Sequence, residues 1–303
     1  MTHLKERLRN LRRWWGLRRL WLLLAAAVAS QNVALLFHTQ GGQASVMGLL
    51  IWAGALICLE DRLPLLRPQP NRVQLVLGSV LLLWVIGRSA QAGHWDGALF
   101  AMAPIAGMAL LLLGVPRRQW RHCREALLCL FMLPAYVLVL RVLPEQPISL
   151  SVAHGAGFLL NSLDFAARVE YRSVLLPGGG VQVLAGCNGL DLMAQLLCVA
   201  ALFQLAFPLR PWRAPLLVFV VTPLLGWFVN SVRVAMLAII AGAGHGKGSA
   251  LFDFFHEQAG SLLFSGAGTL LLGALYLGLL ERQLSAHSTP QPTSTKTRQQ
   301  ELT

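Results

Sequence analysis

Residues 214–240 read APLLVFVVTPLLGWFVNSVRVAMLAII, an apolar run in which Arg233 is the single charged residue. A run of this length can cross the hydrocarbon core of a bilayer as an α-helix, which needs about 20 residues. Pro223 predicts a kink or a break in that helix. Since a charge deep in an apolar span is costly unless it is paired or faces a polar cavity, the stretch also marks a candidate functional site.

Seven further apolar runs extend this interpretation to most of the chain, in which 55% of residues are hydrophobic and 13% are charged. A soluble domain has about 25% charged residues. We therefore predict an all-α polytopic membrane protein and expect no cleaved signal peptide, because the first run is long and more spans follow it. The eight predicted spans are about 20–37, 44–59, 73–87, 98–115, 126–143, 187–207, 214–240 and 260–280.

The predicted spans form one membrane domain at 20–284. A basic, amphipathic segment at 1–19 precedes it. Residues 285–303 are rich in Ser, Thr, Gln and Pro, which predicts a disordered tail. We see no internal repeat.

The distribution of the 25 Lys and Arg residues predicts the orientation. Cytoplasmic loops carry an excess of these residues, and most of them fall in segments that share one side of the predicted topology. Those segments are 1–19, 60–72, 116–125, 208–213 and the residues after 280. Both termini are therefore expected in the cytoplasm of a bacterium, with the chain in its inner (plasma) membrane.

Two longer loops fall on the opposite, outer side. The loop at 144–186 contains a helix-like piece, Ser151–Ala167, and then a predicted β-hairpin. The strands of this hairpin are Val169–Leu176 and Val181–Leu184, around a glycine-rich turn at Pro177–Gly180. The second outer loop is about 241–259.

Cys187 lies in Leu184-Ala-Gly-Cys-Asn-Gly-Leu190, at the outer end of the predicted sixth span. A thiol at a helix N-terminus has a lowered pKa because the helix dipole favours the thiolate. Asn188 is a candidate N-cap, and Gly189 allows a tight turn and close approach of a substrate. The alternative is a small buried hydrophobic residue, which is how we interpret the other four cysteines. They are Cys58, Cys123, Cys129 and Cys198.

Two more candidates fall on the same predicted side. Arg233 shares a helix face with Asn230, three residues earlier; the alternative is an arginine that extends its side chain to the interface. His256 lies just before the last span, with Asp253 and Glu257 near enough in sequence to orient it. Its alternative is an interfacial histidine among aromatic residues.

Together, a thiolate, an imidazole and a guanidinium supply the parts needed for acyl transfer. Cys187 is the candidate nucleophile and His256 the candidate general acid and base. Arg233 is the candidate group that stabilises the oxyanion, with Asn188, Gly189 and Asn230 in support. We expect no metal and no organic cofactor, because the cysteines and histidines lack metal-ligand spacing.

Three short motifs carry a family resemblance, namely Cys187-Asn-Gly189, Asn230-Ser-Val-Arg233 and His256-Glu-Gln-Ala-Gly260. In this order and in this apolar setting, the chain resembles the exosortase/archaeosortase family of polytopic membrane proteins over about residues 150–281. The common family pattern has Ser where this chain has Asn188. With the Gly-Leu-Asp-Leu-Met193 that follows, this variant is similar to cyanobacterial exosortases.

The resemblance implies a membrane-embedded cysteine protease or transpeptidase that acts in protein sorting. Its substrates would be secreted proteins with a C-terminal Pro-Glu-Pro-like (PEP-CTERM-like) motif, a transmembrane helix and a basic tail, which are cleaved near the motif and passed to a surface acceptor. We expect these proteins and the lipid bilayer as partners. Despite the net charge of +12, nucleic acid is not expected, because the basic residues lie in short loops between spans.

Other functions remain open at this stage. A transporter or channel also has embedded polar residues and broken helices, and it would need Arg233 but not Cys187. A non-catalytic factor for exopolysaccharide assembly would keep its function after Cys187→Ala. A transferase that uses His256 without a covalent step would show no reactive thiol at Cys187.

Overall fold

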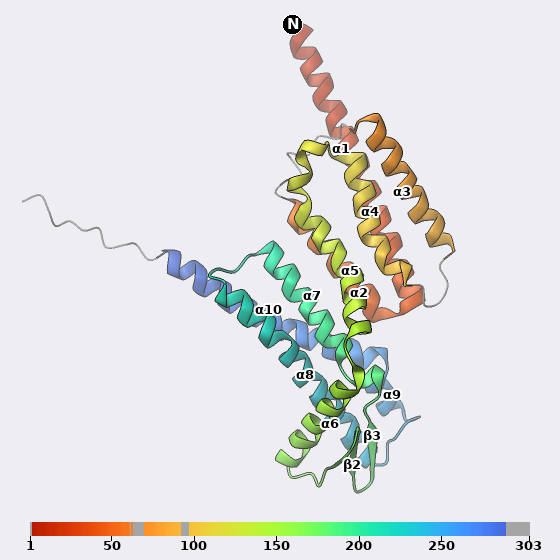
Figure 1. Cartoon of the computed structure of the whole chain (residues 1–303), viewed down its shortest axis with the longest axis vertical. Coiled ribbons are helices and arrows are strands. Elements are labelled where there is room, and N and C mark those ends of the chain that lie inside the picture. The colour runs from red at the N-terminus through yellow and green to blue at the C-terminus, as the bar shows by residue number, and fades with distance from the viewer. Residues whose placement is uncertain (1, 61, 63–69, 92–96, 289–303) are drawn as a thin grey trace, which may run out of the picture.

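The fold is a membrane helix bundle with a small region of short helices and strands at one end (Figure 1). We call this the capping region; it comprises residues 145–187 and 250–256. The computed structural model describes residues 2–60, 62, 70–91 and 97–288. In chain order the first part comprises α1 (Thr2–Gln40), α2 (Gly42–Glu60), α3 (Arg72–Ala90), α4 (Ala98–Gly114), η2 (Arg117–His122) and α5 (Arg124–Val142). The second part comprises α6 (Glu145–Ser162), β1 (Arg168–Glu170), β2 (Ser173–Leu176), β3 (Gly179–Gln182), η3 (Ala185–Cys187), α7 (Leu190–Ala206), α8 (Arg213–Gly242), α9 (Ala250–His256) and α10 (Gln258–Ser288).

Six helices in the described residues are long and apolar enough to cross a membrane. They are found in α1 (as Leu17–Gln40), α2, α3, α5, α8 and α10 (as Ala259–Ser285). The helices at the predicted fourth and sixth spans, α4 and α7, are apolar but have only 17 residues each. The chain is therefore a multi-pass membrane protein, while the count of eight spans stays a prediction.

The bundle has apolar residues on both its inside and its outside, as expected for a protein in lipid. Helix pairs α3–α4, α2–α5 and α1–α2 pack together on one side, and α7 packs on α8. Leucines on the outward faces are exposed, for example Leu83 at 66% and Leu270 at 76%. Bilayer lipid can cover such faces, which water would not solvate favourably.

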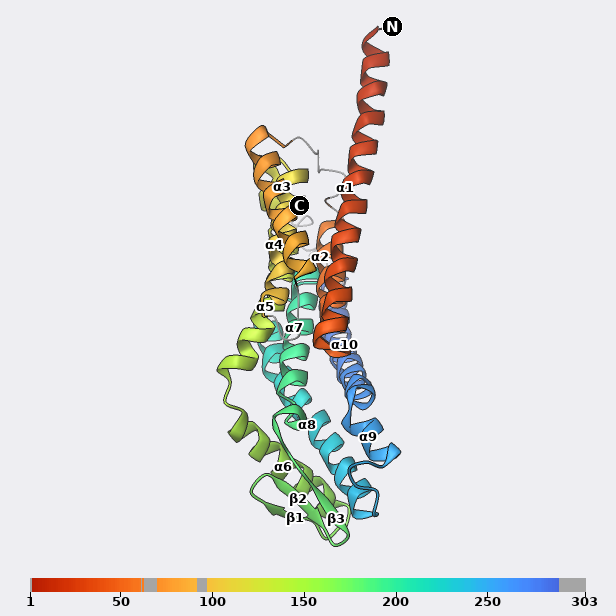
Figure 2. The same ribbon diagram turned by 90° about the vertical axis from the view of Figure 1, so that its right-hand side faces the viewer.

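Helix α8 links the bundle to the capping region. From Arg213 to Arg233 the helix rises about 30 Å, at about 1.5 Å per residue, which matches the roughly 30 Å thickness of a bilayer core. The helix continues to Gly242, and α6 and strands β2 and β3 pack on it. Figure 2 shows α6, the sheet and α9 gathered at this end, far from the start of α1.

Several predicted boundaries were wrong for identifiable reasons. Helix α8 is continuous through Pro223 rather than broken. In the turn before this proline, the hydroxyl of Thr222 donates to the carbonyl of Val218. The helix predicted at Ser151–Ala167 is α6, Glu145–Ser162. It ends early because Asp164 adopts a positive φ of 63°, outside the helical region.

The predicted hairpin is a three-stranded antiparallel sheet in the order β1-β2-β3. The expected single strand at Val169–Leu176 divides at Tyr171, whose φ is +54°. Leu176 pairs with Gly179, so the turn is confined to Pro177 and Gly178 while Gly179 opens a strand. A Cβ at Gly179 would lie 2.6 Å from the carbonyl oxygen of Ala241. The glycine run therefore allows the strand to contact α8, in addition to allowing a turn.

The first and last helices extend beyond the predicted membrane domain at 20–284. The basic segment at 1–19 is helical from Thr2 onward and continues into the first span as α1. The predicted outer loop at 241–259 contains the short helix α9. Helix α10 runs to Ser288, so the predicted tail begins as helix, and its remainder, 289–303, lies outside the described residues.

We predict that Gly178→Ala lowers the melting temperature of the detergent-solubilised protein, because the new Cβ would lie 2.0 Å from the carbonyl oxygen of Gly242. Such overpacking typically costs about 1–3 kcal/mol. The matched control is Gly246→Ala, where a Cβ has no neighbour within 4 Å among the atoms described. Equal melting temperatures for the two variants would contradict the close packing of the turn on α8.

Candidate active site

Cys187 and His256 are in contact at the capped end of the bundle. The Sγ atom of Cys187 lies 3.1 Å from Nε2 of His256. Cys187 ends the η3 turn between β3 and α7, and His256 is the last residue of α9. A nucleophile and a general base must be within hydrogen-bond reach of each other. The thiol is half-buried and the imidazole is exposed, so the pair can be reached from outside.

Helix α8 holds the backbone of both segments. Asn230 Nδ2 donates to the carbonyl oxygen of Cys187 at 2.8 Å. Arg233 donates through Nε to the carbonyl of Phe255 at 3.2 Å and through Nη2 to the carbonyl of His256 at 2.7 Å. Because Asn230 and Arg233 are three residues apart, they share a face of α8. One helix face therefore fixes where the thiol and the imidazole meet.

The contacts of Arg233 explain how a guanidinium is tolerated with only 6% of its surface exposed. The last carbonyls of a helix have no partner within that helix, and they form its negative end. Phe255 and His256 contribute such carbonyls at the end of α9. The arginine and these carbonyls thus satisfy each other's hydrogen-bonding needs in a region with little water.

Two glycines allow the segments to approach α8 and each other. Gly189 has a φ of +75°, and a Cβ there would lie 2.5 Å from Cγ of Asn230. A Cβ at Gly260 would lie 2.4 Å from the carbonyl oxygen of Phe255. Gly189 therefore permits the contact between the cysteine turn and α8, and Gly260 permits α10 to begin directly beside the end of α9.

A comparison of the chain with models of known protein families identifies one family. A family model described as transmembrane exosortase (EpsH) matches residues 39–273. The chain belongs to the transmembrane exosortase family. The match confirms the resemblance drawn from the three motifs and includes every candidate site residue, while the similarity to cyanobacterial members stays a prediction. No curated protein and no solved structure matches this exosortase significantly.

The remaining supporting residue, Asn188, stabilises the start of α7. Its Oδ1 accepts a hydrogen bond from the backbone N–H of Leu190 at 3.0 Å, although the N-cap position itself falls on Gly189. Asn188 is 1% exposed. Its Nδ2 has no hydrogen-bond partner among the described residues.

The expected orientation of His256 by a neighbouring carboxylate was wrong for the described residues. Asp253 lies in the first turn of α9, and its Oδ1 accepts from the backbone N–H of Gly248 in the preceding loop at 3.2 Å. No hydrogen bond or ion pair joins Glu257 to the imidazole in the described part of the chain. Instead, the ring of Phe252 stacks on that of His256, with centroids 5.4 Å apart and an interplanar angle of 16°.

The environment of Cys187 also differs from the expected one. The residue lies in a 3₁₀ turn just before α7 rather than in its first turn. Burial raises the pKa of the Cys187 thiol above its ordinary value, and the charge of Arg233 offsets part of this rise. The predicted lowering of the Cys187 pKa was therefore wrong, because burial outweighs the charge of Arg233 and the thiol form is favoured on balance.

A polar layer behind the site was not predicted from the sequence. Gln43 Nε2 donates to Oε1 of Gln195 at 3.1 Å, and the hydroxyl of Ser261 donates to Oε1 of Gln43 at 3.1 Å. The hydroxyl of Tyr136 donates to Asp191 Oδ1 at 3.0 Å. Polar residues inside or at the ends of apolar spans are uncommon, and this signal could have identified Gln195 and Asp191.

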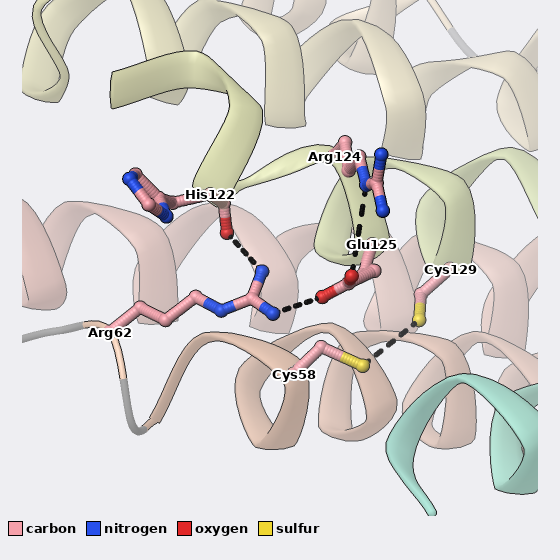
Figure 3. A network of polar contacts seen from close by, with 6 residues as sticks. All are labelled: Cys58, Arg62, His122, Arg124, Glu125 and Cys129. Carbon is pink, nitrogen blue, oxygen red and sulfur yellow. Dashed lines mark hydrogen bonds and ion pairs between the residues drawn. The ribbon is translucent and has the colours of Figure 1, made fainter. Parts of the chain in front are cut away.

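A second polar cluster lies at the other end of α2 (Figure 3). Arg62 pairs with Glu125 at 2.6 Å and donates to the carbonyl of His122 at 2.7 Å. Nearby, the sulfur atoms of Cys58 and Cys129 are 3.8 Å apart. These contacts join the C-terminal end of α2 to the start of α5. The described residues contain no group of three or more His, Cys, Asp and Glu side chains arranged to hold a metal ion.

We predict that alkylation of Cys187 by iodoacetamide continues to accelerate with pH beyond the range in which a free cysteine peptide levels off. The thiolate is the reactive form, and a raised pKa means that the thiolate forms at higher pH. Arg233→Gln removes the offsetting charge and should move the curve further toward high pH.

Label at Cys187 can be followed by peptide mass spectrometry over a series of pH values. The matched control is Arg213→Gln, which removes a charge from the opposite end of α8. A curve for Arg233→Gln that coincides with those of the wild type and this control would contradict the assigned environment of the thiol.

Proposed function

We propose that this exosortase is a membrane-embedded cysteine protease and transpeptidase for C-terminal sorting signals of secreted proteins. The observation that carries the proposal is the 3.1 Å contact between Cys187 Sγ and His256 Nε2. It occurs in a chain whose family is generally of the cysteine-protease or transpeptidase type. The chemistry of the pair supports acyl transfer through a thioester.

In the first half of the proposed reaction, His256 takes the proton of the Cys187 thiol. The sulfur attacks the carbonyl carbon of the scissile peptide bond, and a tetrahedral intermediate with an oxyanion forms. Collapse breaks the C–N bond, and His256 gives its proton to the departing amine. The products are a thioester on Cys187 and a released C-terminal fragment with a free amine.

In the second half, an acceptor amine or a water molecule gives a proton to His256 and attacks the thioester carbonyl. Collapse breaks the C–S bond and returns the proton to the sulfur, which restores the Cys187 thiol. Transfer to an amine at the cell surface gives a joined product, whereas water gives simple cleavage. We favour transfer as the physiological outcome, in keeping with the sorting role expected from the family resemblance.

Arg233 is proposed to stabilise the oxyanion in addition to holding the turn that carries His256. Its Nε and Nη2 groups already donate to backbone carbonyls. Nη1 has no hydrogen-bond partner among the described residues, which leaves it available for a developing negative charge. Donors fixed in this way are worth about 3–4 kcal/mol to acyl transfer in characterised enzymes.

The substrate is proposed to reach the site along the membrane. Arg213 and the site lie at opposite ends of the roughly 30 Å bilayer-spanning part of α8. With both termini in the cytoplasm, as the basic loops predict, the site faces the outer leaflet of the inner membrane. A substrate anchored by its own transmembrane helix would present its Pro-Glu-Pro-like motif at that level.

The test is processing of a secreted reporter that carries such a motif, a transmembrane helix and a basic tail. Wild-type protein should shorten the reporter on a gel, whereas Cys187→Ala and His256→Ala should not. Cys198→Ala, a thiol change within α7, is the matched control and should retain processing.

Processing that survives Cys187→Ala would overturn the nucleophile assignment. If the wild type leaves a correctly inserted reporter intact, the proposal of a sorting peptidase fails. A transporter or a non-catalytic assembly factor would then account better for the embedded polar residues.

A further inference from the structure

Gln43 joins three helices directly behind the candidate active site. It lies in the first turn of α2, far in sequence from the motifs that carry the chemistry. Its Nε2 donates to Gln195 on α7, and its Oε1 accepts from Ser261 on α10, both at 3.1 Å. One side chain therefore uses both ends of its amide to link two other helices.

Those two helices are the ones that follow the catalytic pair in the chain. Helix α7 begins three residues after Cys187, and α10 begins two residues after His256. Gln195 and Ser261 each lie within about two to three helical turns of their respective catalytic residue. The position of Gln43 thus sets how the start of α7 lies relative to the start of α10.

The bridge, by which we mean the hydrogen bonds of Gln43 to Gln195 and Ser261, lies in a buried region. An amide without a hydrogen-bond partner there would destabilise the fold. Gln195 is 2% exposed, and an unpaired buried amide costs about 1–3 kcal/mol. Beside Gln43 and Ser261 is a cavity of about 20 Å³. These two residues contribute to its polar lining, together with Asn230 and Arg233. A space of this size holds about one water molecule. The bridge therefore forms one wall of the polar region around the residues of α8 that hold the site.

We propose that Gln43 is a positioning residue for the Cys187–His256 pair. It maintains the spacing of α7 and α10 and contacts neither the reacting atoms nor the substrate. The assignment gives α2 a role in the chemistry, although all three motifs lie after residue 186. Its kinetic consequence rests on the proposed function, whereas its effect on the reactivity of Cys187 does not.

The test compares Gln43→Leu with the double variant Gln43→Leu/Gln195→Leu. The single change leaves the buried amide of Gln195 without its partner, so both stability and activity should fall. The double change replaces both amides by apolar groups of similar size, which largely restores stability. The hydroxyl of Ser261 can then bond within its own helix, but α7 and α10 remain without the bridge.

A matched control is Gln74→Leu, which removes another buried glutamine. Gln74 is 6% exposed. Its Oε1 accepts from the backbone N–H of Asn71, the N-cap of α3, and its Nε2 donates to the carbonyl of Val115, both at 3.2 Å. This change should lower the melting temperature without affecting the site. Comparison with this control separates the effect of lower protein stability from the effect of misplacing Cys187 and His256.

Three quantities are measured for each variant: the melting temperature, kcat and KM for reporter processing, and the rate of Cys187 alkylation at one pH. For both Gln43 variants we expect kcat to fall about 10- to 100-fold, with KM changed by no more than about twofold. The alkylation rate should fall about tenfold because His256 no longer aligns with the thiol.

Recovery of wild-type kcat and alkylation in the stable double variant would overturn the proposal, since the role of Gln43 would then be structural only. An increase in KM with unchanged kcat would also overturn it, because it would indicate a substrate contact. If the wild type does not process the reporter, the proposed function fails separately, and the alkylation rates alone decide the role of Gln43.

Discussion

The structure depends on how a buried guanidinium in an apolar helix finds its hydrogen-bond partners. Arg233 is largely shielded from water at its position in α8, with 6% of its surface exposed, so its guanidinium needs hydrogen-bond acceptors from the protein. It is satisfied by the carbonyls of Phe255 and His256, which have no partners within α9. The need of the arginine for acceptors and the need of the helix end for donors are met together. The result is a histidine held at a fixed place on α8.

The same logic accounts for the rest of the site. Asn230 satisfies the carbonyl of Cys187 from the next position on the same helix face, and Gly189 and Gly260 leave room for these contacts. The three short motifs are therefore parts of one arrangement of backbone carbonyls around α8. Cys187 and His256 meet as a consequence, although 69 residues separate them.

Much of this was predictable from residue types alone. Apolar runs located the spans, because a bilayer requires long stretches of apolar helix. The isolated charge of Arg233 predicted a candidate site, because an unpaired charge is costly inside a span. Asn230 and Gly189 were predicted as supporting residues from their places in the motifs, and their contacts at the Cys187 turn are consistent with that role. The catalytic roles of Cys187, Arg233 and His256 remain predictions that the geometry supports.

Other features could not be predicted, because they depend on contacts between distant segments. Gly179 was assigned to a turn, yet it lies in a strand that contacts Ala241 on α8. Asp253 was expected at the imidazole, but it bonds the backbone of Gly248 instead. Gln43 gave no local signal, since its partners lie on helices far along the chain. Hydropathy and motif spacing do not indicate which helices become neighbours.

The central claim, that Arg233 acts on Cys187 by holding His256, is tested most directly by a double-mutant cycle on alkylation of Cys187. Arg233→Lys keeps the charge but loses the geometry that binds two carbonyls. We predict that it slows alkylation about tenfold in the wild-type background and has no effect in the His256→Ala background. Equal slowing in both backgrounds would contradict the account, because Arg233 would then act independently of His256.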